Sequence, residues 1–154
     1  MPLELSRLFR PETICLDLKG RDKEAVIGDL IDLLVTAGDL TDRSAAFEAV
    51  LERERKMSTG MQSGIAIPHG KTDSVRDIVA ALGIHRRGVE FQSLDGRPAH
   101  LVVITVSPQE LSGSHVQFLS EVGRILASSG TRERLLKARS AEEVVDLLTQ
   151  GSRP

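Results

Sequence analysis

Apolar side chains recur at helical spacing in several segments of the chain, which predicts helices there. The longest regular stripe runs over Lys23–Ala37, where Asp22 is placed to cap the helix and Gly38 to end it. The stripe consists of Val26, Leu30, Leu33 and Leu34. A second helix is predicted from Asp42 to about Arg55, with Phe47, Val50 and Leu51 on one face. Further helices are predicted at residues 4–9, 114–128, 131–138 and 141–149.

Shorter apolar stretches between these helices predict strands, at residues 13–18, 65–67, 78–85 and 99–106. The stretch Ala99–Val106 is almost entirely apolar, as expected for a central strand covered on both faces, and Asp95-Gly96 predicts a turn before it. Strands mixed with helices predict an α/β fold, a mixed sheet flanked by helices on both faces. Since no linker-like segment interrupts the chain, residues 1–154 are expected to form a single domain.

The composition narrows the class of protein. The formal net charge is −2 and only 3% of residues are aromatic, so we expect no nucleic-acid partner, which would favour a basic excess and stacking side chains. A single cysteine, Cys15, excludes an internal disulfide and a cysteine-based zinc site. The longest apolar run, Leu101–Val106, is too short to span a bilayer, and the first residues lack the pattern of a signal peptide. We therefore expect a cytoplasmic protein.

Residues 64–72 form the most informative segment for chemistry, because a short apolar strand runs directly into Pro-His-Gly. Pro68 fixes its own backbone and restricts Ile67 to an extended conformation, while Gly70 allows close backbone approach or a positive φ. His69 would therefore sit on a stiff backbone at the end of a strand, which suits a reactive side chain. The alternative is a surface loop in which the histidine has no role.

A second histidine, His115, is predicted at the start of a helix. Ser114 and Gln117 fit a capping box with Ser114 at the N-cap, so His115 would be the first helical residue. It would lie above the buried stripe formed by Leu119, Val122 and Leu126. The helix dipole favours anions at this position and disfavours a protonated imidazole. The alternative is a histidine that only covers the edge of the core.

The remaining histidines, His85 and His100, are expected to have structural or surface roles. The sequence contains no HExxH spacing, no glycine-rich phosphate loop and no G-x-S-x-G nucleophile motif. We therefore expect no metal and no cofactor.

Several motifs follow one another in a fixed order. Residues 53–59 read R-E-x-x-x-S-T, residues 64–70 read G-I-A-I-P-H-G, residues 88–98 fit G-V-x-F-x-x-L-D-G-x-P, and His115 opens an H-x-x-x-L segment. In these residues the chain resembles the type-2 enzyme IIA family of the bacterial phosphoenolpyruvate-dependent sugar phosphotransferase system. The family includes the fructose- and mannitol-specific IIA domains and the nitrogen-type regulatory IIA protein. The resemblance covers about residues 3–149 and implies the mannitol-type IIA fold.

The resemblance also implies a phosphocarrier. In the family, the histidine of I-P-H-G accepts a phosphoryl group from the phosphorylated carrier HPr and passes it to a cysteine of a IIB domain. This role falls on His69, through its Nε2 atom. The family's second active-site histidine corresponds to His115 and its arginine to Arg53. The supporting phosphate-binding residues would be Ser58, Thr59 and Gly70.

The chemistry of these residue types is consistent with that role. A neutral imidazole can attack phosphorus with its free lone pair, and the ordinary pKa of histidine leaves it mostly neutral at cytoplasmic pH. We expect the Nδ1 atom of His69 to donate to a backbone carbonyl, which would leave Nε2 as the nucleophile. Arg53 offers a planar pair of donors to phosphate oxygens.

Three functions are compatible with the sequence. A fructose-type sugar carrier is favoured by residues 67–73 and 94–98, and would reach the membrane only indirectly, through a IIC transporter. A nitrogen-type regulator, whose phosphorylation state controls the binding of a target protein, is favoured because no IIB or IIC segment accompanies the chain. A pure binding module is opposed by the joint presence of His69, His115 and Arg53. Any partner protein would dock on an apolar patch beside the histidines, for which the candidates are Met57, Met61, Ile65 and Val75.

Overall fold

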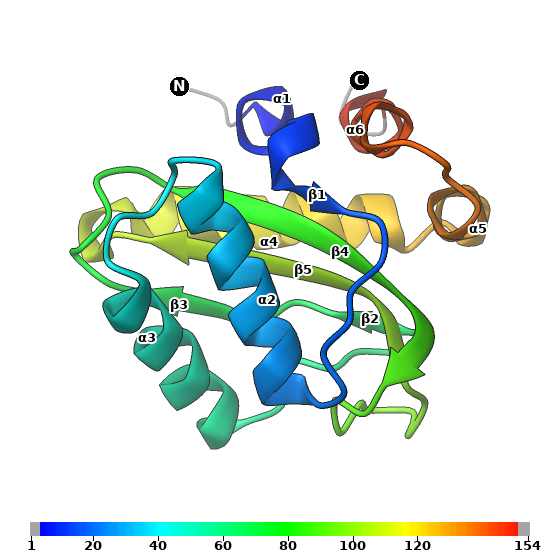
Figure 1. The fold of residues 1–154 in the computed structure, drawn as a ribbon, viewed down its shortest axis with the longest axis horizontal. Helices are drawn as coiled ribbons and strands as arrows, with labels where there is room; N and C mark the ends of the chain where they lie inside the picture. Colours follow the sequence, from blue (N-terminus) through cyan, green and yellow to red (C-terminus); the bar gives the residue numbers. More distant parts are fainter. Residues whose placement is uncertain (1–3, 151–154) are drawn as a thin grey trace.

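The structure is a computed structural model that describes residues 4–150 (Figure 1). Its helices are α1 (Leu5–Leu8), α2 (Lys23–Thr36), α3 (Arg43–Lys56), α4 (Ser112–Leu126), α5 (Ser129–Leu136) and α6 (Ala141–Gln150). Short 3₁₀ turns occupy Pro11–Thr13 (η1) and Gln109–Leu111 (η2). The strands are β1 (Ile14–Cys15), β2 (Ile65–Ala66), β3 (His69–Lys71), β4 (Val79–Val89) and β5 (Ala99–Ser107).

The strands form one five-stranded mixed sheet, in the order β1-β4-β5-β2 with β3 also paired to β5. The central pair β4–β5 is antiparallel, whereas β1 is parallel to β4 and both β2 and β3 are parallel to β5. Strands β2 and β3 therefore follow one another along the same edge of β5. They are separated at Ile67–Pro68, because proline lacks the N–H that a continuous ladder requires.

The helices cover the sheet on both faces, as the sequence predicts (Figure 1). Helices α2 and α3 pack on one face, and α4 covers the other together with α1, α5 and α6. Strand β5 contributes alternate residues to the two cores: Leu101 and Val103 pack toward α4, and Val102 and Ile104 toward α2 and α3. The prediction of a central strand buried on both faces is confirmed.

The ends of the two long helices follow the capping signals in the sequence. The side chain of Asp22 accepts a hydrogen bond from the backbone N–H of Ala25 at 2.8 Å, and Asp42 does the same for Ala45 at 3.0 Å. Gly38 follows α2 with a φ of +86°, a conformation that glycine adopts without strain. Each acidic cap stabilises its helix by about 1 kcal/mol relative to alanine.

Some strand boundaries differ from the prediction. Strand β3 was missed because His-Gly-Lys shows no apolar alternation; it is a strand only because its backbone pairs with β5. Strand β4 continues past His85 to Val89, with a register shift between Ile84 and Val89 and a positive φ of 87° at Gly88. Of the predicted strand at 13–18, only Ile14–Cys15 forms a strand, parallel to β4, and the backbone N–H of Leu18 donates to the Ile84 carbonyl at 2.8 Å.

The starts of two helices differ as well. Helix α4 begins at Ser112 with Leu111 at the N-cap, so the predicted capping role of Ser114 is wrong. The reason is that η2 runs directly into α4, with the Ser112 hydroxyl donating to the Gln109 carbonyl at 2.8 Å. His115 is thus the fourth helical residue rather than the first, although still in the first turn. Helix α5 also begins earlier than predicted, because Ser128 caps it.

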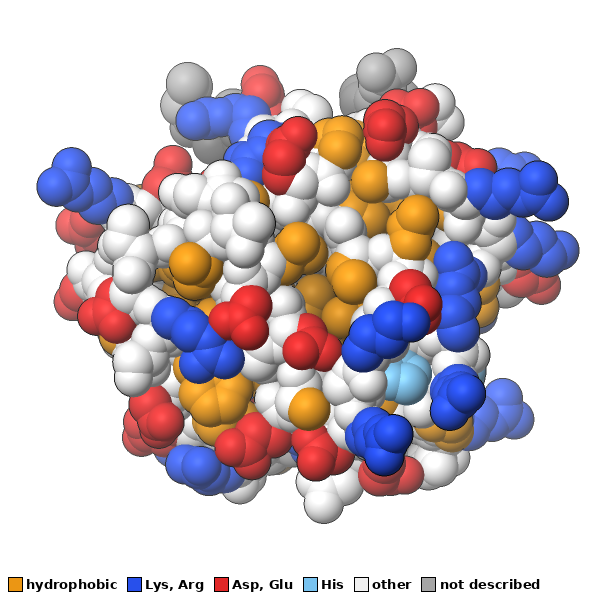
Figure 2. Space-filling view, in the orientation of Figure 1, with side chains coloured by type: hydrophobic (Ala, Val, Ile, Leu, Met, Phe, Trp, Pro, Cys, Tyr) orange, Lys and Arg blue, Asp and Glu red, His pale blue; other side chains and the backbone are white. Residues whose placement is uncertain are grey.

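The surface carries charges of both signs. On the face shown in Figure 2, Lys and Arg side chains alternate with Asp and Glu, and no large region of one sign forms.

Among the described residues, no helix combines the length and the hydropathy needed to cross a membrane.

Candidate active site

A groove of about 450 Å³ lies where edge strand β3 meets α3 on one side and the start of α4 on the other. It brings together His69, His115 and Arg53, which the sequence places in separate motifs. The other lining residues are Ala49, Glu52, Lys56, Gly70, Lys71, Gln109 and Leu119. A larger hollow of about 690 Å³, beside α1 and residues 74–79, contains no histidine. The smaller groove is the candidate site, because it holds the groups capable of phosphoryl chemistry.

Successive residues of β3 face opposite sides of the sheet, so this one strand contacts both α3 and α4 at the groove. His69 and Lys71 extend toward α4, where they contact His115 and Ser112. Gly70 lies between them and faces α3. A Cβ atom at Gly70 would lie 2.8 Å from the backbone nitrogen of Val50, so only glycine allows α3 to pack directly on β3. This is the close backbone approach expected from the sequence; a direct contact of Gly70 with phosphate stays a prediction.

His69 has one ring nitrogen fixed by its own chain. Its Nδ1 lies 2.9 Å from the carbonyl oxygen of Ile67. Because a carbonyl oxygen can only accept, Nδ1 carries the hydrogen, and Nε2 of the neutral ring keeps its lone pair. Pro68 holds the carbonyl in place by restricting Ile67 to an extended conformation. The expected hydrogen bond from Nδ1 to a backbone carbonyl is thus present.

His115 is almost fully buried beside His69. Only 4% of its surface is exposed, and its Nδ1 lies 2.7 Å from the hydroxyl of Ser107 at the end of β5. The centroids of the two imidazole rings are 5.1 Å apart, in an edge-to-face arrangement. His115 is therefore a direct neighbour of His69 in the groove.

The groove lowers the pKa of both histidines. Burial lowers the pKa of His115 to about 4, and the nearby charges of His69 and Lys71 act in the same direction. Burial also lowers the pKa of His69, and the positive charges of Arg53 and Lys71 oppose protonation further. The hydrogen bond to Ile67 and the negative charge of Glu54 act in the opposite direction. The lowered pKa of His115 agrees with the expected neutral imidazole, and burial is its largest cause.

Lys71 sets part of this electrostatic environment, and its removal has a predictable effect. Its ammonium donates to the Ser112 hydroxyl at 3.0 Å. We expect Lys71→Met to raise the pKa of His69 and to raise that of His115 above about 4, because a nearby positive charge disfavours protonation of both rings. NMR titration of the imidazole C–H signals measures both values. The control Lys56→Met removes a cation that also lines the groove but is not among the charges that act on either ring, so both pKa values should stay unchanged. Unchanged values in Lys71→Met would contradict the prediction.

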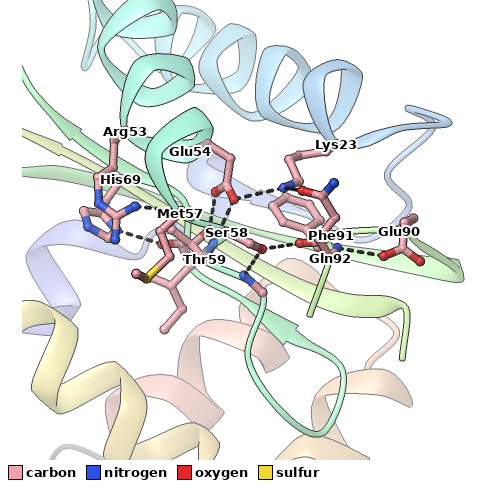
Figure 3. A network of polar contacts seen from close by, with 12 residues as sticks. Lys23, Arg53, Glu54, Met57, Ser58, Thr59, His69, Glu90, Phe91 and Gln92 are labelled. Atoms are coloured by element: carbon pink, nitrogen blue, oxygen red, sulfur yellow. Dashed lines mark hydrogen bonds and ion pairs between the residues drawn. The ribbon is translucent and has the colours of Figure 1, made fainter. Parts of the chain in front are cut away.

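Arg53 reaches the groove from the last turn of α3. Its guanidinium donates to the carbonyl oxygen of Met57 at 2.8 Å, which satisfies an otherwise free carbonyl after the end of the helix (Figure 3). The charge of Arg53 also acts on the imidazole of His69. The predicted group of His69, His115 and Arg53 is thus assembled at one place.

Ser58 and Thr59 do not join that group. The Ser58 hydroxyl donates to the Phe91 carbonyl, and the Thr59 hydroxyl donates to the carboxylate of Glu54 (Figure 3). Neither residue lines the groove. Their predicted role in phosphate binding has no supporting contact here; their hydroxyls hold the turn after α3 instead.

Several polar residues without a role in the sequence-based prediction support the site. Ser107 contacts His115, Ser112 contacts Lys71, and Glu54 contacts Thr59. The only sequence signal for Glu54 was its place in the R-E motif.

His85 and His100 bind backbone carbonyls, of Gly20 and His85 respectively, and lie outside the groove, in agreement with a structural role.

The proposed docking patch is only partly exposed. Met57 is 70% exposed and Met61 39%, whereas Ile65 and Val75 are buried in the core. Leu94 and Val116 are also exposed, at 80% and 63%. Met57 and Met61 can therefore meet a partner, and the inclusion of Ile65 and Val75 was wrong because both pack against other elements of the fold.

A groove with two imidazoles of lowered pKa and three cations, Arg53, Lys56 and Lys71, suits a protein that handles phosphoryl groups. The chain matches, over residues 7–151, the family model described as phosphoenolpyruvate-dependent sugar phosphotransferase system, EIIA 2. The protein therefore belongs to this family of phosphotransfer components, as its motifs predict.

Relatives of both kinds named in the sequence analysis are found. The chain is 38% identical to the fructose-specific EIIA component of Haloferax volcanii, over 96% of each chain. It is equally similar, at 38%, to the fructose-specific EIIABC component of Bacillus subtilis, but spans only 23% of that protein. It is 30% identical to the nitrogen regulatory protein of Bradyrhizobium diazoefficiens, over 95% of each chain.

Solved structures confirm the fold. The nitrogen regulatory protein IIA-Ntr of Neisseria meningitidis superposes with a TM-score of 0.88 at 30% identity, covering 94% of this chain and 99% of that one. Enzyme IIAMTL of Escherichia coli, solved in complex with phosphorylated enzyme IIBMTL, superposes with a TM-score of 0.77 at 27% identity, covering 90% and 95%.

Proposed function

We propose that the protein is a phosphocarrier in which His69 accepts a phosphoryl group from a phosphorylated HPr-type carrier and passes it to a cysteine of a IIB component. The observation that carries the proposal is the hydrogen bond from Nδ1 of His69 to the Ile67 carbonyl. It leaves Nε2 as a lone-pair donor in a groove that also contains Arg53 and His115.

In the accepting step, the lone pair of Nε2 attacks the phosphorus atom carried by the donor's histidine. A new N–P bond forms while the donor's N–P bond breaks, and the electron pair of the broken bond returns to the donor imidazole. Because Nε2 of neutral His69 carries no proton, no general base is needed. The proton on Nδ1 stays in its hydrogen bond to Ile67, which holds the ring in orientation throughout.

The other groove residues stabilise the charge of the group in transfer. Phosphoryl transfer depends mainly on positioning and on electrostatic stabilisation of the phosphoryl oxygens. Arg53 offers two parallel N–H donors, and Lys71 adds a second positive charge. In the tautomer of His115 in which Nδ1 accepts from the Ser107 hydroxyl, the Nε2–H of that ring is free to donate to a phosphoryl oxygen.

In the second step, a cysteine thiolate of the IIB partner attacks the same phosphorus atom, and the N–P bond to His69 breaks. Its electron pair returns to Nε2, which restores the neutral ring. Support for such a partner comes from the IIAMTL relative, which is solved in complex with its phosphorylated IIB enzyme. The higher identity to the fructose-specific relatives favours a fructose-type IIB as the acceptor.

A nitrogen-type regulatory function is the second candidate, and one observation favours it: the TM-score of 0.88 to IIA-Ntr exceeds the 0.77 to IIAMTL. In this case no sugar is transported. Phosphorylation of His69 would add negative charge, roughly −1.5 to −2 as for other phosphorylations, at the groove and so alter the binding of a target protein.

The proposal is tested by phosphotransfer from phosphoenolpyruvate through enzyme I and an HPr-type carrier, in both the general and the nitrogen-type versions. We expect acid-labile phosphate on the protein, discharged when a fructose-type IIB domain is added. Stable label in the presence of that IIB domain, with a target that binds one phosphorylation state only, would instead support the regulatory function. Absence of label with both carriers would contradict the phosphocarrier role and leave a binding module.

A further inference from the structure

A buried carboxylate, that of Glu54, follows the groove residue Arg53 in the chain but does not line the groove itself. The side chain of Glu54 is only 3% exposed, although it follows Arg53 in α3. It accepts hydrogen bonds from the backbone N–H of Thr59 at 2.8 Å and from the Thr59 hydroxyl, and it pairs with the ammonium of Lys23 at 3.1 Å (Figure 3). A buried charge with this many partners holds each of them in place.

Lys23 connects this carboxylate to two other parts of the fold. It is the first residue of α2, and its ammonium also donates to the side-chain oxygen of Gln92 at 3.0 Å. The same ammonium lies 5.3 Å from the centroid of the Phe91 ring. The pair therefore joins the start of α2, the end of α3 and the segment after β4 at one point.

The turn that Glu54 holds is the turn that orients Arg53. Met57 accepts the hydrogen bond from the Arg53 guanidinium, and Ser58 and Thr59 follow it directly. Ser58 is bound to the Phe91 carbonyl and Thr59 to Glu54. The position of the Met57 carbonyl is thus set from both sides, by the end of α3 and by the two anchored residues after it (Figure 3).

We propose that Glu54, paired with Lys23, is a positioning residue for phosphoryl transfer: it fixes the Met57–Thr59 turn and thereby holds the Arg53 guanidinium at the groove beside His69. The inference rests on the proposed function, because it gives Arg53 the role of binding the phosphoryl group. It also gives a reason for the buried ion pair of Glu54 and Lys23. Stability alone explains such a pair poorly, because it is often no more stabilising than an apolar pair of the same volume.

The first test measures Arg53 itself and needs no phosphotransfer. We expect the Nε–H signal of Arg53 to report a rigid side chain by ¹⁵N relaxation in the wild type, and a mobile one in Glu54→Gln. Lys23→Met should have the same effect from the other side of the pair, which covers the case that one variant fails to fold. Arg53 equally rigid in a folded Glu54→Gln or Lys23→Met protein would overturn the proposal, whatever the outcome of the labelling assays.

The second test measures the rate of phosphoryl transfer to His69. We expect Glu54→Gln to slow transfer about tenfold by displacing the guanidinium, and to have no further effect in an Arg53→Leu background. Asp39→Asn is the matched control, because Asp39 is a largely buried carboxylate, 16% exposed, paired with Arg10 at 2.7 Å outside the groove. It should lower stability without slowing transfer. Equal slowing by Glu54→Gln with and without Arg53 would overturn the proposal, whereas an unlabelled wild type would overturn the phosphocarrier role alone.

Discussion

Replacement of His69 by glutamine is expected to abolish acid-labile labelling by a phosphorylated HPr-type carrier. An amide cannot form a phosphohistidine, so the loss should be complete rather than graded. The side chain of His69 is half-buried at the edge of the sheet, so the substitution should leave the fold intact. The measurement is the phosphate bound per protein after incubation with phosphoenolpyruvate, enzyme I and the carrier, with circular dichroism to verify folding.

Two other histidines give the matched controls for this experiment. His100→Gln changes a histidine outside the groove and should label like the wild type. His115→Gln removes the buried neighbour of His69 and should still label, but more slowly. Label that persists in His69→Gln and disappears in His115→Gln would show that the roles of the two histidines are exchanged.

Arg53→Leu is expected to lower the rate of phosphoryl transfer to His69 by about a hundredfold, without preventing labelling at long times. Loss of one preorganised donor to developing charge commonly costs about this factor. Arg53→Lys should recover only part of the rate, because an ammonium cannot supply two parallel hydrogen bonds. Single-turnover transfer from the phosphorylated carrier, followed by rapid quench, measures the rate.

Arg55→Leu is the control for that prediction. Arg55 lies in the same last turn of α3 but is exposed and does not line the groove. It should therefore transfer at the wild-type rate. Equal rates for Arg53→Leu and the wild type would show that Arg53 does not take part in the transfer step. An effect of Glu54 through Arg53 would then no longer be expected.

The elements with strong local signals were predicted well. Helix α2 begins after Asp22 and ends before Gly38, and strand β5 is buried on both faces, because capping side chains and apolar runs act over a few residues. Strand β3 was missed since His-Gly-Lys forms a strand only through its pairing with β5. The predicted start of α4 was wrong because η2 runs directly into the helix at Ser112, two residues before Ser114.

The site was predicted in part. His69, His115 and Arg53 came from the motifs, and the structure places them in one groove. Ser58 and Thr59 came from the same motifs, but their hydroxyls are bound to Phe91 and Glu54 and neither residue lines the groove, so their role in phosphate binding stays a prediction. Motifs identify which residues are near a site; the direction of each side chain depends on the backbone between them.

By itself, the sequence determined the helix caps, the stiff Ile-Pro-His segment and the family to which the chain belongs. These properties depend on neighbouring residues or on residue identities in a fixed order. Only the tertiary structure decided that His69 and His115 touch, since their contact requires the edge position of β3 and the place of α4 beside β5. It also decided the low pKa of His115 and the partners of Glu54, because burial and charge depend on residues that lie far apart in the chain.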